Sequence, residues 1–161
     1  MTQSPSEMTL VDPFLRPLSE LSGDPWLALP EATPYSEAVE RMRESRAGSL
    51  VVVKDGRPAG VFTERDVLNK CLLEGLAPAT PLSSLMTPAP VTLPATATVR
   101  EAIALMHAKR IRNIPLVDAA GAPKGLLTVG RLIRFLAYAF PAEVVNLPPR
   151  PGQVTEEVEG A

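Results

Sequence analysis

Two side chains near the middle of the chain have the types and spacing that could bind a ligand. Thr63 carries a hydroxyl, and Asp66, three residues later, carries a carboxylate. A strand is expected to end at Thr63 and a helix to begin after it, where unpaired backbone N–H groups and the helix dipole favour an anionic group. The carboxylate could accept two hydrogen bonds from a ribose diol, and the hydroxyl could meet a phosphate or sugar oxygen. The alternative is that Thr63 and Asp66 only cap the helix.

A second segment repeats this pattern with one exchange. Residues 125–131 read Gly-Leu-Leu-Thr-Val-Gly-Arg, so that Arg131 stands where the first copy has Asp66. A guanidinium has five donors and no acceptor, so it can bind a phosphate but cannot replace a carboxylate toward a diol. The alternative for Arg131 is a surface position or an ion pair with an acidic neighbour. Lys109 and Arg110, at the end of an expected helix, should face solvent or complement the helix dipole.

Composition narrows the classes of function. The chain has 161 residues, 16 Lys or Arg, 18 Asp or Glu and a formal net charge of -2. No basic cluster indicates binding to nucleic acid or to a membrane surface. Cys71 and His107, the single cysteine and the single histidine, are too few for a structural zinc site. The sequence shows neither a membrane-spanning stretch nor a secretory signal, so we expect a reduced, cytoplasmic context. The common phosphate-binding, dinucleotide-binding and hydrolase motifs are missing, which predicts that the chain is not an enzyme.

An internal repeat predicts two copies of one structural unit. Shifting the chain by 64 residues aligns identical residues, and after a turn the shift becomes 65. One extra residue in a turn is well tolerated. The aligned pairs include Leu18 with Leu82, Leu21 with Leu85, Met42 with Met106, Arg46 with Arg110, and Thr63 with Thr128. Two copies are too few for a solenoid, so we expect a pair packed about a pseudo-twofold axis.

Each copy predicts the element order β-α-β-β-α, and therefore an α/β (α+β) fold. The first copy should have strands at 26–29, 50–53 and 61–63, a helix capped by Thr33 with Pro34 in its first position, and a helix at 64–74. The second copy should have strands at 90–93, 114–117 and 126–128, a helix that begins with the capping box of Thr98 and Glu101, and a helix at 129–139. The side chains expected to face inward from the last helix of each copy are Val67, Leu68, Cys71, Leu72, Leu132, Ile133 and Leu136.

Three motifs in register with the repeat resemble those of the CBS-domain family. Residues 60–66 (Gly-Val-Phe-Thr-Glu-Arg-Asp) resemble the family's G-h-x-[ST]-x-x-D ligand motif. The segment Leu85-Met86-Thr87-Pro88 resembles the start of the family's second repeat, and 106–118 resembles its M…R…PVVD strand. The resemblance covers about residues 17–140 and implies a stand-alone tandem CBS pair, also called a Bateman module.

The resemblance also divides the chain. The first CBS domain is expected at 17–77, and the second at 78–140, including a linker at 78–85. Residues 1–16 are expected to form an N-terminal tail and the Pro-rich, acidic residues 141–161 a C-terminal tail.

Ligands of this family bind in clefts between the repeats, so the resemblance implies an adenosine-containing ligand: AMP, ADP, ATP or S-adenosylmethionine. It places the ribose at Asp66 with Thr63 beside it, and a phosphate at the basic residues Arg112 and Arg131. The positions that match the family's adenine contacts are Ala28, Thr33, Leu50 and Val61. No metal is implied.

Two functions remain open from the sequence. One is a regulatory module that senses the adenosine nucleotide, and the other is a ligand-free scaffold for dimerisation. Asp66 favours sensing, whereas the replacement of the second carboxylate by Arg131 favours a reduced role. The resemblance further implies a homodimer, with the helical segments 67–72 and 132–136 as the apolar faces, and an unidentified regulated protein as a partner.

Overall fold

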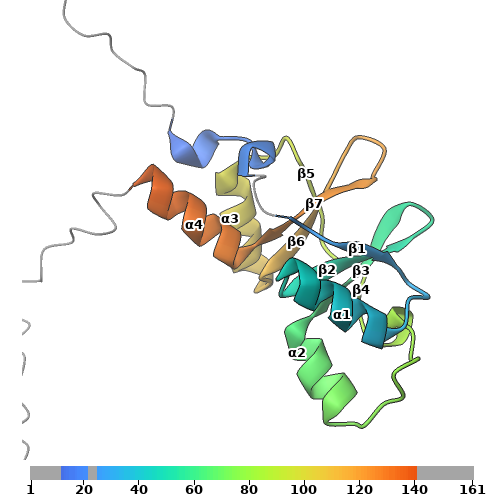
Figure 1. Cartoon of the computed structure of the whole chain (residues 1–161). Coiled ribbons are helices and arrows are strands. Elements are labelled where there is room, and N and C mark those ends of the chain that lie inside the picture. Colours follow the sequence, from blue (N-terminus) through green and yellow to red (C-terminus); the bar gives the residue numbers. More distant parts are fainter. Residues whose placement is uncertain (1–11, 22–24, 141–161) are drawn as a thin grey trace, which may run out of the picture.

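The computed structural model describes residues 12–21 and 25–140, which form two β-α-β-β-α units (Figure 1). The first unit contains β1 (Ala28–Pro30), α1 (Tyr35–Ser45), β2 (Ser49–Lys54), β3 (Arg57–Thr63) and α2 (Glu64–Asp66). The second contains β5 (Leu93–Pro94), α3 (Val99–Lys109), β6 (Asn113–Val117), β7 (Pro123–Thr128) and α4 (Val129–Ala139). This arrangement confirms the predicted mixed fold of two equivalent repeats.

Short elements complete the described chain. Three are 3-10 helices, η1 (Pro13–Leu15), η2 (Leu18–Leu21) and η4 (Leu82–Ser84), and β4 (Thr87–Pro88) is a two-residue strand. The helix expected at 64–74 is an α-helix only in its first turn, α2, and continues as the π-helical segment η3 (Val67–Leu72). Backbone bonds from Leu73 N–H to the Leu68 carbonyl and from Leu76 N–H to the Cys71 carbonyl carry this wider turn onward.

The two sheets have the same connectivity. In the first, strands lie in the order β1-β2-β3-β4, with β1 parallel and β3 antiparallel to β2. In the second, the order is β5-β6-β7, with β5 parallel and β7 antiparallel to β6. Even the register irregularities are equivalent, at Val52/Val53 in β2 and Leu116/Val117 in β6. Figure 1 shows α1 and α2 beside the first sheet and α3 and α4 beside the second.

The pseudo-twofold axis passes near one hydrogen bond. The Ser49 hydroxyl at the start of β2 donates to the Asn113 side-chain oxygen at the start of β6 over 3.1 Å. The two residues are 64 positions apart, so they occupy the same place in the two repeats. Equivalent residues can meet only beside the axis that relates them, and β2 also contacts β7 while β3 contacts β6.

The repeats exchange their leading segments. Leu18 and Leu21 of η2 lie in the core of the second repeat with residues such as Val99 and Ile114. Reciprocally, Leu82 and Leu85, at and after η4, lie in the core of the first repeat with Phe62 and its neighbours. The Leu18 N–H donates to the Ala97 carbonyl over 2.8 Å, and the Leu82 N–H donates to the Thr33 carbonyl over 2.9 Å. Each repeat therefore completes its core with the segment that precedes the other.

Residues 12–16, which the sequence places in the N-terminal tail, belong partly to this exchange. Phe14 of η1 packs against the core of the second repeat, and its ring lies 5.7 Å from that of Phe140. The Arg16 carbonyl accepts a hydrogen bond from the Val99 N–H over 3.0 Å. The remaining tail residues, 1–11 and 141–161, lie outside the described residues.

Two local expectations are wrong. Helix α1 begins at Tyr35 with Pro34 as its N-cap, and no side chain caps it, so Thr33 is not a cap. Pro34 is extended, with a ψ of 140°, which places it outside the helix, and Thr33 is buried in the turn before it. Leu68, Leu72 and Ile133, expected inside, are exposed.

The exposure of these three side chains has a geometrical cause. The π-helical turn changes the rotation per residue after α2, so that only Cys71 of η3 is fully buried. In α4, Leu132 points inward, and the next residue, Ile133, is turned by about 100° around the helix. The capping box of Thr98 and Glu101 is confirmed, with the Glu101 carboxylate 2.6 Å from the Thr98 N–H.

Candidate functional site

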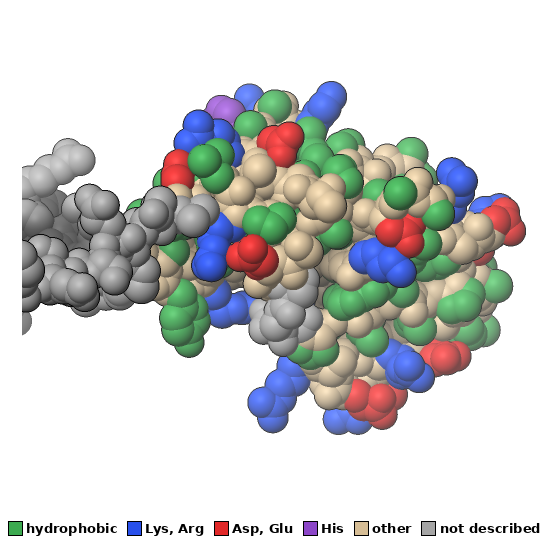
Figure 2. Space-filling model, turned by 90° about the horizontal axis from the view of Figure 1, so that it is seen from above, with side chains coloured by type: hydrophobic (Ala, Val, Ile, Leu, Met, Phe, Trp, Pro, Cys, Tyr) green, Lys and Arg blue, Asp and Glu red, His purple; other side chains and the backbone are tan. Residues whose placement is uncertain are grey.

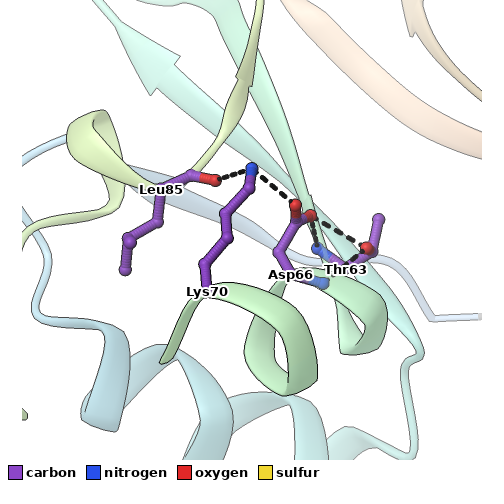
Figure 3. A network of polar contacts seen from close by, with 4 residues as sticks. All are labelled: Thr63, Asp66, Lys70 and Leu85. Atoms are coloured by element: carbon purple, nitrogen blue, oxygen red, sulfur yellow. Dashed lines mark hydrogen bonds and ion pairs between the residues drawn. The ribbon is translucent and has the colours of Figure 1, made fainter. Parts of the chain in front are cut away.

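The start of α2 contains a closed network of hydrogen bonds (Figure 3). The Asp66 N–H donates to the Thr63 hydroxyl oxygen over 3.3 Å. In return, Oδ2 of Asp66 accepts from the Thr63 N–H over 2.9 Å and from the Thr63 hydroxyl over 2.8 Å. Thr63 and Asp66 therefore form a complete capping box, and Asp66 is only 8% exposed. The structure therefore confirms that Thr63 and Asp66 cap helix α2.

Lys70 links this network to the connection between the repeats. Its ammonium group lies 2.7 Å from Oδ1 of Asp66 and donates to the Leu85 carbonyl over 2.6 Å. Figure 3 shows the lysine side chain between the carboxylate and this carbonyl. Both carboxylate oxygens of Asp66 thus have partners. The partner of Oδ1, Lys70, also holds the Leu85 carbonyl at the end of η4.

An open cleft of about 1210 Å³ lies between the repeats, and we call it the inter-repeat cleft. Equivalent residues of both repeats line it: Thr63 and Thr128, Asp66 and Arg131, Ser49 and Asn113, Arg46 and Arg110. Thr128 accepts a hydrogen bond from the Arg131 N–H over 3.1 Å, as Thr63 does from Asp66, but Arg131 has no carboxylate to return. Equivalent positions of the two repeats therefore line the cleft, but the first repeat has a carboxylate, Asp66, where the second has a guanidinium, Arg131.

The structure gathers four of the predicted site residues in the inter-repeat cleft: Thr63, Asp66, Arg112 and Arg131. Val61 lines a smaller adjoining pocket of about 250 Å³, which shares Thr63 and Arg112 with the cleft. Ala28, Thr33 and Leu50 line neither of these two pockets of the described residues. Ala28 is exposed on β1, whereas Thr33 and Leu50 are buried.

Four arginines of the cleft were not predicted as site residues, namely Arg46, Arg65, Arg110 and Arg134. Arg110, which was expected to face solvent or to complement the helix dipole, is exposed at the C-cap of α3 and also lines the cleft. Together with Arg112 and Arg131 they make six arginines, against two carboxylates, Glu64 and Asp66. Figure 2 shows one face of the molecule, where Lys and Arg side chains are interspersed with Asp and Glu. The signal that could have found Arg46 and Arg110 is their equivalence in the repeat.

The cleft also has an apolar part. Pro25, Trp26 and Ala47 line it on the first-repeat side. The side chain of Trp26 is partly buried. An indole beside an opening of this kind offers a flat apolar surface to a planar ring.

Cys71 belongs to the core beneath this site. It is 1% exposed and packs with Leu82 and Leu85 in the first-repeat core. Burial raises the pKa of the Cys71 thiol, and the negative charge of Asp66 adds to this effect. The thiol is therefore held in its protonated, unreactive form. The described ranges contain no group of three or more His, Cys, Asp or Glu residues that could hold a metal ion.

Fold and sequence agree on the class of protein. A search with protein-family models matches the CBS domain to residues 18–72 and again to 82–138. The chain belongs to the CBS-domain family and is a tandem CBS pair. This confirms the family predicted from the three motifs.

The chain is also similar to individual proteins and solved structures. It is 29% identical over 153 residues to the mitochondrial CBS domain-containing protein CBSX3 of Arabidopsis thaliana, covering 91% of this chain and 74% of the relative. An uncharacterised protein of Methanopyrus kandleri is 33% identical over 111 residues, covering 66% of this chain and 57% of the relative. Among solved structures, a CBS domain protein of Pyrobaculum aerophilum complexed with AMP is similar, with a TM-score of 0.67 and 26% identity over 78% of this chain and 99% of that one. No helix within residues 12–21 and 25–140 is long and apolar enough to cross a membrane.

Proposed function

We propose that this chain is a regulatory module that binds an adenosine-containing nucleotide in the inter-repeat cleft. The observation that carries the proposal is the convergence of Thr63 and Asp66 of one repeat with Arg112 and Arg131 of the other on one opening. A hydroxyl and a carboxylate suit a ribose, and guanidinium groups suit a phosphate. The AMP complex of the similar Pyrobaculum aerophilum protein supports this choice of ligand.

The ribose would bind at the first-repeat motif. A carboxylate has about four lone-pair positions, and Asp66 uses three of them, two toward Thr63 and one toward Lys70. A diol that donates two hydrogen bonds therefore needs the position held by Lys70, or the Thr63 hydroxyl must turn away. The adenine would lie against the apolar surface of Pro25, Trp26 and Ala47.

We propose a single nucleotide for each chain. The second repeat has Arg131 where a ribose-binding carboxylate would stand, and a guanidinium offers a diol no acceptor. Arg131 instead adds positive charge to the cleft in which Asp66 lies, and only 8% of it is exposed. In this arrangement the second repeat contributes phosphate contacts to the site of the first.

Regulation would follow from the connection between the site and the exchanged segments. Lys70 bridges Asp66 and the Leu85 carbonyl, and Leu85, the last residue of the linker, packs in the first-repeat core. A ribose that displaces Lys70 from Asp66 changes how this segment is held. Such a change is a signal only if the nucleotide has different affinities for the two arrangements.

The second candidate function is a ligand-free scaffold. The observation in its favour is a set of exposed apolar side chains on the last helical segment of each repeat, η3 with its C-cap and α4: Leu68, Leu72, Leu73, Ile133 and Tyr138. Exposed apolar groups of this size mark contact surfaces. We propose that they join two chains in a homodimer, with or without a nucleotide, and that a regulated protein binds the pair.

The proposal includes no catalytic role and a cytoplasmic location. The name of the Arabidopsis relative places that protein in mitochondria, so cell fractionation of the natural host is the test of location.

The proposed function is tested by calorimetric titration of the chain with AMP and ATP. The expected result is saturable binding of one nucleotide per chain, together with a higher midpoint of thermal unfolding. A ligand at 100 times its Kd adds about 2.7 kcal/mol to the free energy of unfolding. Two equivalent sites per chain would contradict the asymmetric site, and an absence of binding would favour the scaffold.

A further inference from the structure

Two arginines close helices α1 and α3 in an unusual backbone conformation. Arg46 has φ 53° and ψ 36°, and Arg110 has φ 54° and ψ 38°, both in the left-handed region. The backbone N–H of each arginine donates to carbonyls in the last turn of its helix. The Arg46 N–H, for example, donates to the Arg43 and Met42 carbonyls. This position after a helix is usually glycine, because a Cβ atom is strained there. Both repeats nevertheless carry arginine.

The two arginines face the same opening. Arg46 and Arg110 are 64 positions apart and line the inter-repeat cleft from opposite repeats. Within residues 12–21 and 25–140, Arg46, Arg65, Arg110 and Arg112 take part in none of the ion pairs found. Like charges gathered around one cavity repel one another, and a bound anion relieves this repulsion. A strained backbone that presents such a side chain is a feature of binding sites.

The charge and the size of the cleft limit the ligand. Asp66 is paired with Lys70, so Arg46, Arg65, Arg110 and Arg112 against Glu64 alone leave an excess of three positive charges in the cleft. One phosphate monoester supplies about 1.5 to 2 negative charges, which does not compensate this excess. S-adenosylmethionine carries a sulfonium and an ammonium group against one carboxylate, so its net charge has the wrong sign. The volume of about 1210 Å³ also exceeds the range of roughly 300–1000 Å³ that is usual for ligand pockets.

We infer that the inter-repeat cleft selects a polyphosphate chain, and that Arg46 and Arg110 bind its outer phosphates from the two sides. The ligand class is then adenosine di- or triphosphate, in preference to AMP, adenosine and S-adenosylmethionine. The adenosine part of this inference rests on the proposed function. The polyphosphate part rests on the arginines alone, so an inorganic polyphosphate is a probe that separates the two.

The test compares ligands and variants by calorimetry at low ionic strength, with ATP, AMP, S-adenosylmethionine and inorganic tripolyphosphate as probes. ATP should bind at least about tenfold more tightly than AMP, since each added charged contact contributes strongly. Arg46→Gly and Arg110→Gly should each weaken ATP and tripolyphosphate by about tenfold, and AMP by less than about twofold. Because glycine relieves the left-handed strain, neither variant should lower the midpoint of thermal unfolding.

Two control variants separate the site from general effects. Arg57→Ala removes an arginine on the β2–β3 hairpin that does not line the cleft, and Asp55→Gly places glycine at another left-handed position. Both should bind ATP as the unmutated chain does.

Equal affinity for AMP and ATP, or equal loss of both in the glycine variants, overturns the polyphosphate inference while the proposed function stands. If tripolyphosphate binds and ATP binds no more tightly than tripolyphosphate, the proposed function is overturned while the polyphosphate site stands. No binding of any probe overturns both.

Discussion

Asp66 caps the start of α2 and also lines the inter-repeat cleft. Its carboxylate closes the capping box with Thr63 and forms an ion pair with Lys70, so it already stabilises the start of α2. The same side chain lines the inter-repeat cleft. Because a capped helix start is rigid, the carboxylate is held in one position before any ligand arrives, which lowers the entropy cost of binding. Capping is therefore compatible with the ribose contact that we propose for Asp66.

Arg131 provides a prediction at the level of one residue. Arg131→Ala should weaken AMP by about tenfold or more, because a charge-assisted hydrogen bond to phosphate contributes about 1.5–3 kcal/mol. Plain adenosine presents no anion, so its affinity should change little. Calorimetric titration of the variant with both ligands measures the difference. An equal loss for adenosine and AMP would show that Arg131 does not act on the phosphate.

Residue types indicated only part of the site. Thr63, Asp66, Arg112 and Arg131 carry functional groups whose positions follow from the repeat, and they do line one cleft. Leu50 and Thr33 were predicted only because their positions match the adenine contacts of the family. In the structure both are buried, Leu50 in the first-repeat core and Thr33 in the turn before α1. Arg46 and Arg110 escaped notice because an arginine at a helix end ordinarily extends into solvent. In the structure both residues are exposed, have a left-handed backbone conformation and line the cleft.

At the level of elements, strands β2, β3, β6 and β7 were easier to predict than the last helix of the first repeat, whereas the strand expected at 90–93 is only the two-residue β5 (Leu93–Pro94). Strand β2 was found because its apolar run is buried, with Leu50, Val51 and Val52 all inaccessible. The segment after α2 was expected to keep the period of an α-helix, but it is π-helical over Val67–Leu72. A π turn depends on how the helix meets its surroundings, and the apolar spacing does not encode it.

Strand β3 provides a prediction that distinguishes the two repeats. An added Cβ at Gly60 would lie 2.7 Å from Cγ and 2.9 Å from Cβ of Met86, whereas the nearest atom to one at Gly125 is Leu116 Cδ1 at 3.6 Å. Gly60→Ala should therefore lower the free energy of unfolding by about 1–3 kcal/mol, and Gly125→Ala should change it by less than about 0.5 kcal/mol. Chemical denaturation of both variants measures this. Equal losses would mean that the contact with Met86 does not determine the cost.

At the level of the whole molecule, the repeat was visible in the sequence but the exchange of segments was not. Leu18 and Leu82 are equivalent, so their spacing is the same whether each packs on its own repeat or on the other. In the structure each packs on the other repeat. This reciprocal packing joins the halves into one unit and makes the inter-repeat cleft a permanent part of the chain. The equivalence of the sequences could not decide between the two arrangements.

The exposed apolar side chains provide a prediction about assembly. Light scattering at micromolar concentration should give the mass of two chains, because Leu73 is 80% and Tyr138 is 86% exposed. Leu73→Asp should shift the mass toward one chain. The control is Leu15→Asp, which changes an exposed leucine of η1 and should leave the dimer intact. A single-chain mass for the unmutated protein, with and without nucleotide, would contradict the homodimer.

The central claim is that Asp66 binds the ribose of a nucleotide, and a pair of matched variants tests it most directly. Asp66→Asn and Glu101→Gln each remove one carboxylate charge from the third position of a capping box, and only Asp66 lines the inter-repeat cleft. Calorimetric titration with AMP should show at least a tenfold loss of affinity for Asp66→Asn, since a hydrogen bond to a charged group contributes about 1.5–3 kcal/mol. Glu101→Gln should bind AMP as the unmutated chain does. Unchanged affinity in a folded Asp66→Asn protein, or an equal loss in both variants, would contradict the account.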